Sequence, residues 1–268
     1  MSAALRVLSL GAGVQSTAVA LMAARGEIEP PDCAIFADTG AEPAAVYQHL
    51  DWLEAQLPYP VHRVQARWGP LGDAVLASYA ADKRGASPPF FTKNPDGMLP
   101  RHCSVEAKVR PINAKIREML GVAPGRRVPA GVTVEVWLGI SIDEAHRMKP
   151  SENAWMKNCW PLIDAGMSRA NCLSWLSQRQ YPIPGKSACV WCPYHSDEMW
   201  RAMKADQPED FAAAVAFDAA IRDGSRGMQG TVYVHRSRVP LDQADLRSWA
   251  QRGQPDLFGN ECEGVCNT

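Results

Sequence analysis

The sequence predicts an α/β fold built on a doubly wound parallel sheet. Three observations predict it: apolar strand-like segments alternate with helical ones, a turn of small residues follows the first strand, and polar residues follow the later strands. With 268 residues the chain can bury a substantial core, either as one large α/β domain or as a domain with an extension. We expect an α/β domain over residues 1–150 and a mainly helical, cysteine-containing C-terminal part over residues 151–268.

Four apolar segments are predicted to form the strands, at residues 5–10, 33–37, 61–65 and 133–140. A helix around residues 46–56 separates the second strand from the third. Beyond about residue 150 the strand pattern fades, and helices are predicted at residues 169–178, 197–205 and 208–221. Residues 87–100 are rich in proline, glycine and asparagine, which predicts a loop.

Composition restricts the classes of function. A formal net charge of -1 argues against attraction of the whole molecule to nucleic acid, although a local basic face is compatible with it. No apolar run is long enough for a transmembrane span, and the N-terminus lacks the charged region of a signal peptide, so we expect a cytoplasmic protein. In a reducing compartment, eight cysteines suggest metal or redox chemistry rather than disulfides, with Cys33 expected in the core.

The turn after the first strand is the first candidate site. Gly11, Ala12 and Gly13 would let backbone N–H groups approach a ligand closely. Ser16 and Thr17 follow at the start of a helix, where hydroxyls and N–H groups favour an anion. The turn lacks the lysine of the Walker A motif and the spacing of the Rossmann glycines. The alternative is a plain strand-to-helix turn without a ligand.

Polar groups also follow the second and fourth predicted strands. Asp38, Thr39 and Gly40 offer a carboxylate and a hydroxyl suited to a ribose or a metal, or else a turn that caps the next helix. A third group lies at residues 139–147. Ligands of doubly wound sheets bind beyond the carboxyl ends of the strands, so these groups belong to one predicted edge.

The cysteines provide candidate metal ligands. Cys189 and Cys192 have the spacing that grips one iron or zinc ion, and Cys103 or the tail thiols Cys262 and Cys266 would complete a four-ligand site. The alternative is a pair of unligated thiols. Basic residues on both sides of Cys103 favour the thiolate that binds metals; they are Arg101, Lys108 and Arg110.

Two further groups of cations are open to two interpretations. His235, Arg236 and Arg238 would contact phosphates or lie on a solvated edge strand. Lys115 and Arg117 would face a phosphate-rich ligand or solvent from a helix that begins near Pro111.

Taken together, these motifs resemble the phosphoadenosine-phosphosulfate (PAPS) reductase-like family of the PP-loop ATP pyrophosphatase, or adenine nucleotide alpha hydrolase, group. The likeness is strongest to members from phages and prophages and extends from about residue 7 to residue 241. The family's Ser-Gly-Gly-x-Asp-Ser loop corresponds to residues 11–16, with Gly11 and Gln15 in place of its first Ser and its Asp. Its Asp-Thr-Gly-x-x-x-Pro, Gly-x-Arg-x-x-x-Ser-x-x-Arg and Asn-Pro-Leu-x-Asp elements resemble residues 38–43, 139–147 and 160–164, with Ser141 in place of an arginine.

This resemblance implies a Rossmann-like (HUP-type) fold and an ATP or adenosine-phosphosulfate site, with Mg²⁺ as a further cofactor. The implied nucleotide-binding residues are Ser9, Gly11, Ala12, Gly13, Gln15, Ser16, Thr17, Asp38, Thr39, Gly40, Gly139, Ser141 and Arg147. Asp38 and Lys108 are implied as catalytic residues.

The resemblance also extends to the cysteines. Iron–sulfur members carry Cys-Cys-x-x-Arg-Lys-Val-x-Pro-Leu and a later Cys-x-x-Cys, which together hold a 4Fe–4S cluster. Cys103 matches the first thiol and Ser104 replaces the second, as in the sulfur-transfer members that act on DNA. Cys189 and Cys192 match the later pair, so the fourth ligand would be Cys266, Cys262 or Cys172. The reductases end in Glu-Cys-Gly-Leu-His, and the retained Glu-Cys makes Cys262 the implied nucleophile.

We favour an ATP-dependent sulfur-transfer enzyme with a 4Fe–4S cluster, which adenylates an acceptor such as tRNA, DNA or a small molecule. It would work with a sulfur-donor protein, as a monomer or a homodimer. One alternative is a phosphosulfate reductase that releases sulfite with a thioredoxin-like partner. The other is a zinc-stabilised nucleotide- or DNA-binding protein that uses Lys108, Arg110, Arg236 and Arg238.

Overall fold

The computed structural model describes residues 4–81, 88–224, 230–248 and 251, which form two compact units. The first, here the sheet unit, comprises Met1–Asp38, Ala44–Gln65 and Lys108–Ser187. The second, the cysteine unit, comprises Thr39–Pro43, Ala66–Ala107 and Ala188–Thr268. The units interleave along the sequence, in contrast to the single boundary expected near residue 150, because the chain leaves the sheet unit after Asp38 and after Gln65 and returns to it each time.

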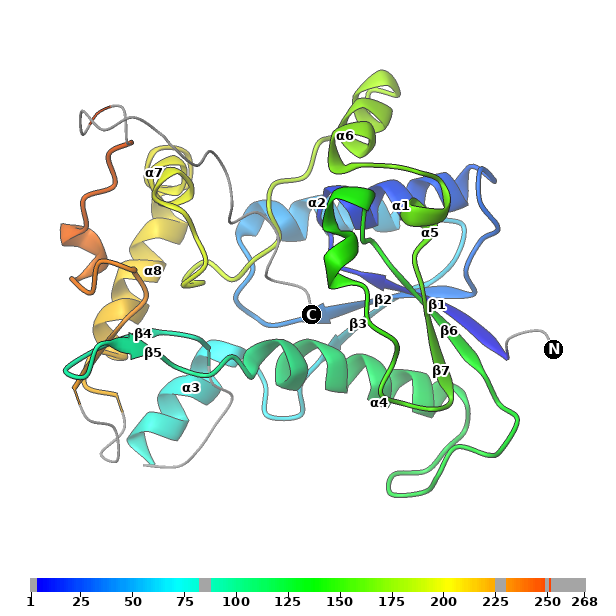
Figure 1. Ribbon diagram of the computed structural model, residues 1–268, viewed down its shortest axis with the longest axis horizontal. Coiled ribbons are helices and arrows are strands. Elements are labelled where there is room, and N and C mark those ends of the chain that lie inside the picture. The colour runs from blue at the N-terminus through cyan, green and yellow to red at the C-terminus, as the bar shows by residue number, and fades with distance from the viewer. Residues whose placement is uncertain (1–3, 82–87, 225–229, 249–250, 252–268) are drawn as a thin grey trace. The chain divides into compact units, whose positions relative to one another are not determined.

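The sheet unit confirms the predicted α/β class. Its parallel sheet has the strand order β3-β2-β1-β6-β7 (Figure 1). All four predicted strands are present, as β1 (Leu5–Leu10), β2 (Cys33–Asp38), β3 (Val61–Gln65) and β6 (Val134–Leu138). The fifth strand, β7 (Met156–Cys159), was not predicted. Two of its four residues, Lys157 and Asn158, are polar, and none of the four is fully buried. β7 is an edge strand paired with β6 alone, so it lacks the apolar run of a central strand.

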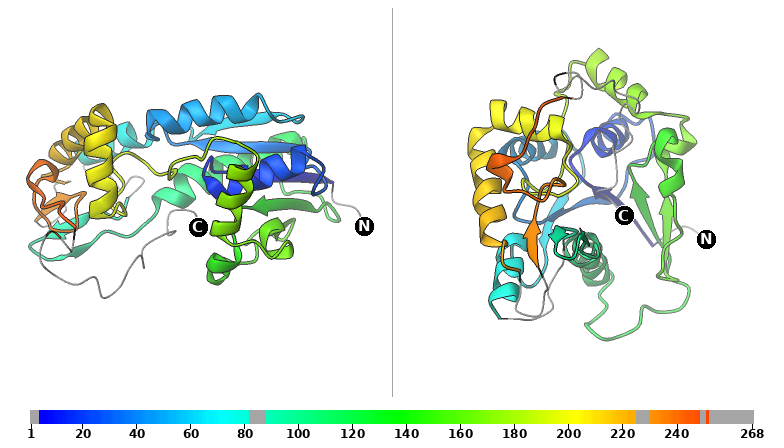
Figure 2. Two further views of the ribbon diagram at one scale, coloured as in Figure 1. Left: turned by 90° about the horizontal axis from the view of Figure 1, so that it is seen from above. Right: turned by 60° about the vertical axis from the view of Figure 1, so that its left-hand side comes forward.

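Helices cover both faces of this sheet (Figure 1 and Figure 2). On one face Leu8 and Phe36 pack with α1 (Val14–Ala24), α2 (Ala44–Glu54) and α6 (Arg169–Gln178). On the other face Val7 and Ile35 pack with α4 (Arg110–Met119). Successive side chains of a strand point to opposite faces, so strands buried on both sides read as continuous apolar runs. This explains why β1 and β2 were recognisable from the sequence.

Short elements connect the sheet unit's last segments. The 3-10 helix η2 (Ile142–Arg147) follows β6, and α5 (Pro161–Asp164) follows β7. A π-helix, η1 (Val105–Val109), runs directly into α4, with Pro111 in the first turn where a missing N–H is tolerated. None of the helices within the described ranges is both long and apolar enough to cross a membrane.

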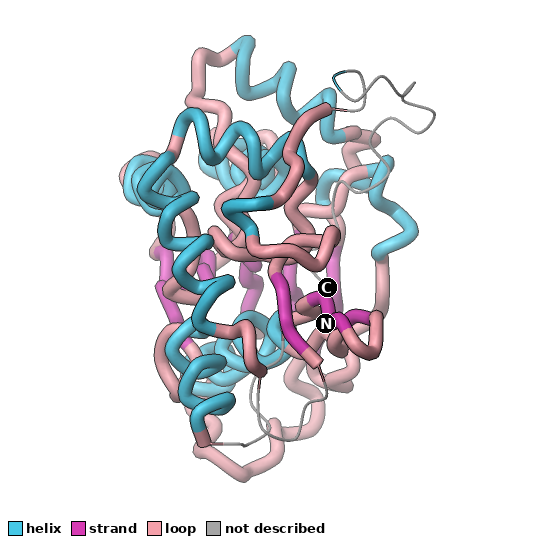
Figure 3. The backbone as a smooth tube through the Cα atoms, turned by 90° about the vertical axis from the view of Figure 1, so that its left-hand side faces the viewer, coloured by secondary structure: helices cyan, strands magenta, loops and turns pink. Residues whose placement is uncertain are grey.

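The cysteine unit is mainly helical, with short strands (Figure 3). Its helices are α3 (Leu71–Ala80), α7 (Asp197–Asp206) and α8 (Pro208–Ala220), followed by the 3-10 helix η3 (Leu241–Gln243). Trp200 and Phe90 are fully buried in its core, where Trp191 stacks on Phe217 with ring centroids 4.2 Å apart. Burial of such large aromatic side chains stabilises this unit.

The expectation of a plain loop at residues 87–100 was wrong. This segment contains β4 (Phe91–Lys93) and β5 (Gly97–Met98), and β4 also pairs antiparallel with β8 (Thr231–Tyr233). The turn residues Asn94 and Gly97 belong to a hairpin rather than a loop, and the strands are too short to show alternation in the sequence.

Candidate functional site

The predicted loop closes on itself at the carboxyl end of β1. The Ser16 hydroxyl accepts a hydrogen bond from the Gly11 N–H (3.3 Å) and donates one to the Gly13 carbonyl (3.2 Å). Ala12 is buried in a left-handed conformation (φ 53°), which a small residue tolerates best. The loop is therefore a fixed turn whose backbone leads directly into α1.

The N-terminus of α1 has no side-chain cap and no acidic residue in its first turn. A helix N-terminus left in this state carries unsatisfied N–H groups and a partial positive charge. Gly139, directly after β6, comes so close that a Cβ atom there would lie 2.8 Å from the Ser16 nitrogen. Any side chain at residue 139 would therefore displace the loop, and only glycine fits beside it.

Gln15 connects this loop to two distant segments of the sheet unit. Its side-chain amide lies between Glu144, 129 residues later, and Arg169, 154 residues later. Arg147 donates a hydrogen bond to Glu144 (2.8 Å), and both of these side chains are largely buried. The predicted residues Gln15 and Arg147 are thus brought together, whereas Arg169 was missed because no sequence motif marks it.

Asp143 holds the start of α6, because its Oδ1 accepts a hydrogen bond from the Arg169 backbone N–H (3.0 Å). Burial alone would raise the pKa of the Asp143 carboxyl, but the neighbouring Ser141 hydroxyl and the Arg169 N–H lower it below its ordinary value. Asp143 is therefore ionised at neutral pH, and it holds the first residue of α6. Ser141, predicted as a ligand contact, is fully buried.

Two loop neighbours are held by residues of α2. Asp38, at the end of β2, accepts a hydrogen bond from the Tyr47 hydroxyl (2.7 Å). The fully buried Thr17 hydroxyl lies 3.0 Å from His49 Nε2, and burial lowers the pKa of His49, which keeps that imidazole neutral at pH 7. Neither Tyr47 nor His49 was predicted, and only their positions on the α2 face would have pointed to them. Ser9 is half-buried within β1, where it pairs with Ile35 and Leu138.

Thr39 and Gly40 lie in the cysteine unit. Gly40 has φ 68°, and a Cβ atom there would lie 2.7 Å from the Pro70 Cβ, so glycine is required on both counts. The buried Thr39 hydroxyl donates to Glu42 (3.3 Å) and lies 3.5 Å from the Cys189 sulfur. This connects the Asp-Thr-Gly segment with the Cys-x-x-Cys segment.

Cys189 and Cys192 occupy one tight turn. The Cys192 N–H donates to the Cys189 carbonyl (2.9 Å), and the buried His195 donates to that same carbonyl through Nε2 (2.8 Å). The His195 side chain thus stabilises the turn by contacting the backbone carbonyl of Cys189. Ser104, where the resembling family has a second cysteine, accepts a hydrogen bond from the Arg101 guanidinium (2.6 Å).

The remaining predicted metal and catalytic residues are spread over the chain. Within the described ranges, no three His, Cys, Asp or Glu side chains gather into a group that could hold a metal ion. Cys103 is partly buried against the core that also contacts Cys189. Cys172 is fully buried, and burial raises the pKa of its thiol to about 11. Cys262 and Cys266 lie outside the described residues, and Lys108 is half-buried at the end of η1.

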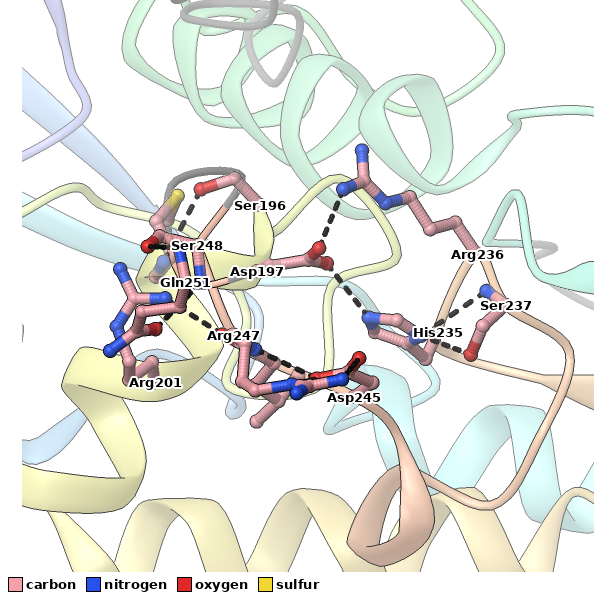
Figure 4. A network of polar contacts seen from close by, with 12 residues as sticks. Ser196, Asp197, Arg201, His235, Arg236, Ser237, Asp245, Arg247, Ser248 and Gln251 are labelled. Atoms are coloured by element: carbon pink, nitrogen blue, oxygen red, sulfur yellow. Dashed lines mark hydrogen bonds and ion pairs between the residues drawn. The ribbon is translucent and has the colours of Figure 1, made fainter. Parts of the chain in front are cut away.

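The basic segment after β8 is folded into a network of ion pairs (Figure 4). Asp197, in the first turn of α7, contacts His235 Nε2 (3.0 Å) and the Arg236 guanidinium (2.7 Å). Burial would raise the pKa of Asp197, but these two partners lower it to about 2. Arg238 pairs with Asp96 at 3.4 Å. The three predicted phosphate-contacting cations therefore all contact carboxylates.

Lys115 and Arg117 are also engaged within the chain. Lys115 contacts Glu118 (2.6 Å), and Arg117 donates to the Ala123 carbonyl (3.4 Å). These contacts favour the interpretation that Lys115 and Arg117 lie on a solvated face of α4 rather than facing a phosphate-rich ligand.

Comparison with protein-family models finds no match, and neither does comparison with curated proteins. Among solved structures, the chain is similar to the phosphoadenylyl-sulfate (PAPS) reductase of Candida auris, whose crystal structure is a phosphate complex. The two share 14% sequence identity at a TM-score of 0.44, over 67% of this chain and 74% of that chain. A likeness of this strength assigns no activity, so the function has to be argued from the residues above.

Proposed function

We propose that this chain is an enzyme that uses an adenine nucleotide, with residues 11–17 around the phosphates. The observation that carries the proposal is the uncapped N-terminus of α1 at the carboxyl edge of a parallel sheet. Gly139 has no side chain that would press on this helix start. Ligands of doubly wound sheets bind at this edge, and phosphates bind at such helix N-termini. Asp38, held by Tyr47, is suited to accept a hydrogen bond from a ribose hydroxyl.

The proposed reaction is ATP-dependent sulfur transfer. An oxygen of the acceptor would attack the α-phosphorus of ATP, pyrophosphate would leave, and a sulfur nucleophile would then displace AMP. Arginine side chains and N–H groups at the loop would stabilise the charge that builds up on the leaving pyrophosphate. Arg147 is the proposed arginine, and its ion pair with Glu144 orients it.

The proposed sulfur chemistry depends on the cysteines. Cys262 is the proposed nucleophile, and Cys103, Cys189, Cys192 and Cys266 are the proposed ligands of a 4Fe–4S cluster. The thiols in the described ranges do not by themselves form a complete ligand set. We therefore derive no catalytic step through a cluster. Iron, sulfide and zinc quantitation on anaerobically purified protein tests this part directly.

Acceptor-dependent pyrophosphate release tests the reaction. The purified chain is incubated with ATP and, in separate assays, with tRNA, DNA and small acceptors. The proposal predicts pyrophosphate release that depends on one acceptor class and is abolished in Asp38→Asn. Binding of ATP without release in any assay would contradict the reaction. Sulfite release from a phosphosulfate nucleotide with thioredoxin would identify a reductase instead.

A further inference from the structure

Arg169 is hydrogen-bonded through its side chain to a neutral group, unlike Arg147. Its Nη1 donates to the Gln15 Oε1 atom (3.2 Å), which is a neutral amide oxygen. Among the described residues Arg169 takes part in no ion pair, whereas Arg147 is paired with Glu144. No carboxylate is hydrogen-bonded to this guanidinium, although the charge of the nearby Asp143 acts on it, and it can still attract an incoming anion. Its backbone N–H is fixed separately, by Asp143 Oδ1 at 3.0 Å.

We propose that Arg169 contacts the phosphate chain of the nucleotide bound at residues 11–17, and that Gln15 is the residue that positions it. This inference rests on the proposed function and names a contact within the same site. The ligand chemistry is that of a pyrophosphate group, either free or within a nucleoside triphosphate. Guanidinium groups bind phosphate oxygens through two parallel hydrogen bonds, which gives both affinity and orientation.

The chemistry of Gln15 explains why an amide suits this position. Its Nε2 donates to Glu144 Oε2 (3.2 Å) while its Oε1 accepts from Arg169. An amide is the side-chain group that donates at one end and accepts at the other, whereas a carboxylate only accepts. A carboxylate at residue 15 would repel Glu144 and would neutralise Arg169. The amide therefore holds Arg169 beside the loop without neutralising the positive charge of its guanidinium.

The test is equilibrium binding of inorganic pyrophosphate, ATP and adenosine, measured by titration calorimetry on the full chain. Arg169→Ala is expected to weaken pyrophosphate and ATP at least about tenfold, the range for a hydrogen bond to a charged group, and to leave adenosine unchanged. Arg169→Lys keeps the positive charge without the planar guanidinium and is expected to lose less affinity for pyrophosphate and ATP than Arg169→Ala. Gln15→Glu is expected to weaken pyrophosphate more than Gln15→Met, because only the former adds a negative charge.

Arg179→Ala is the matched control. Arg179 is at the other end of the same helix and contacts Glu27 and the Trp175 ring. It is expected to leave pyrophosphate affinity unchanged. Added salt should weaken pyrophosphate binding to the wild type more than to Arg169→Ala, because salt screens the charge of Arg169, which the variant lacks.

The outcomes separate this inference from the proposed function. If the wild type binds ATP and pyrophosphate and Arg169→Ala binds them equally well, the inference is wrong and the proposed function stands. If the wild type binds neither, both are wrong. Should Arg169→Ala fail to fold, equal affinities in the wild type, Arg169→Lys and Gln15→Glu would overturn the inference.

Discussion

Arg169 of the sheet unit and the basic residues 235–238 of the cysteine unit are held by different kinds of partner. In the sheet unit Arg169 is held at the loop by the neutral amide of Gln15. In the cysteine unit Arg236 and His235 converge on the carboxylate of Asp197, and Arg238 contacts Asp96. A basic stretch of sequence therefore does not by itself supply charge for a ligand. What matters is whether folding brings carboxylates to it, and this comparison supports Arg169 as the proposed phosphate contact.

The largest effect on stability is expected in the cysteine unit, at Asp218. This buried carboxylate accepts hydrogen bonds from the Val234 and Leu241 N–H groups (2.8 and 3.1 Å) and pairs with Arg222. Asp218→Ala leaves all three donors without this partner and is expected to cost about 3–5 kcal/mol in free energy of unfolding. Chemical denaturation measures it. The exposed Asp223→Ala is the control, with an expected change within about 0.5 kcal/mol; an equal loss in both variants would contradict the structural role of Asp218.

A smaller, pH-dependent effect is expected at Asp197. Its folded pKa of about 2 lies below the ordinary unfolded value of about 3.9. A lowered folded pKa stabilises the folded state above the unfolded pKa, and this contribution is lost as pH falls through the folded pKa. Asp197→Asn is therefore expected to cost about 2 kcal/mol above pH ~4, with the difference disappearing toward pH ~2.

Denaturation midpoints of Asp197→Asn between pH 2 and 7 check this window. Asp206→Asn, an exposed change at the other end of α7, is the control and should show no such window. A stability difference for Asp197→Asn that stays constant down to pH 2 would mean that its ion pairs do not stabilise the fold.

The smallest effect is expected where α6 begins in the sheet unit. Ser168 accepts from the Asn171 N–H (3.1 Å), and Asn171 accepts from the Ser168 N–H (2.9 Å), which forms a capping box. Ser168→Ala is expected to lower the free energy of unfolding by about 1 kcal/mol. Thermal unfolding measures it against Ser177→Ala, an exposed change on the same helix. If the two variants unfolded alike, the cap would contribute nothing.

The central strands β1 and β2 were predictable because burial on two faces gives a strand a continuous apolar sequence, as in β2. α6 was predicted over its observed range, Arg169–Gln178, and the structure adds the Ser168 cap at its start. β7 and the β4–β5 hairpin were missed because edge pairing and tight turns need no such run.

The candidate site was predictable only in part. Glycines at residues 13 and 139 and the polar residues after β1, β2 and β6 follow from the edge rule for parallel sheets. Arg169, Tyr47 and His49 were not predictable, since their contacts join residues distant along the chain. Tertiary packing determines which polar residues lie near the loop, and a local sequence pattern does not predict such long-range contacts.

The most direct test of the central claim is ATP binding by the wild type, Gly139→Ala and Gly185→Ala. A Cβ atom at residue 139 would press on the loop backbone at Ser16, whereas at residue 185 it would meet nothing within 4 Å. We predict that the wild type and Gly185→Ala bind ATP with the same affinity and that Gly139→Ala binds at least about tenfold more weakly. A wild type with no ATP affinity, or a Gly139→Ala variant that binds as tightly as the wild type, would contradict a nucleotide site at residues 11–17.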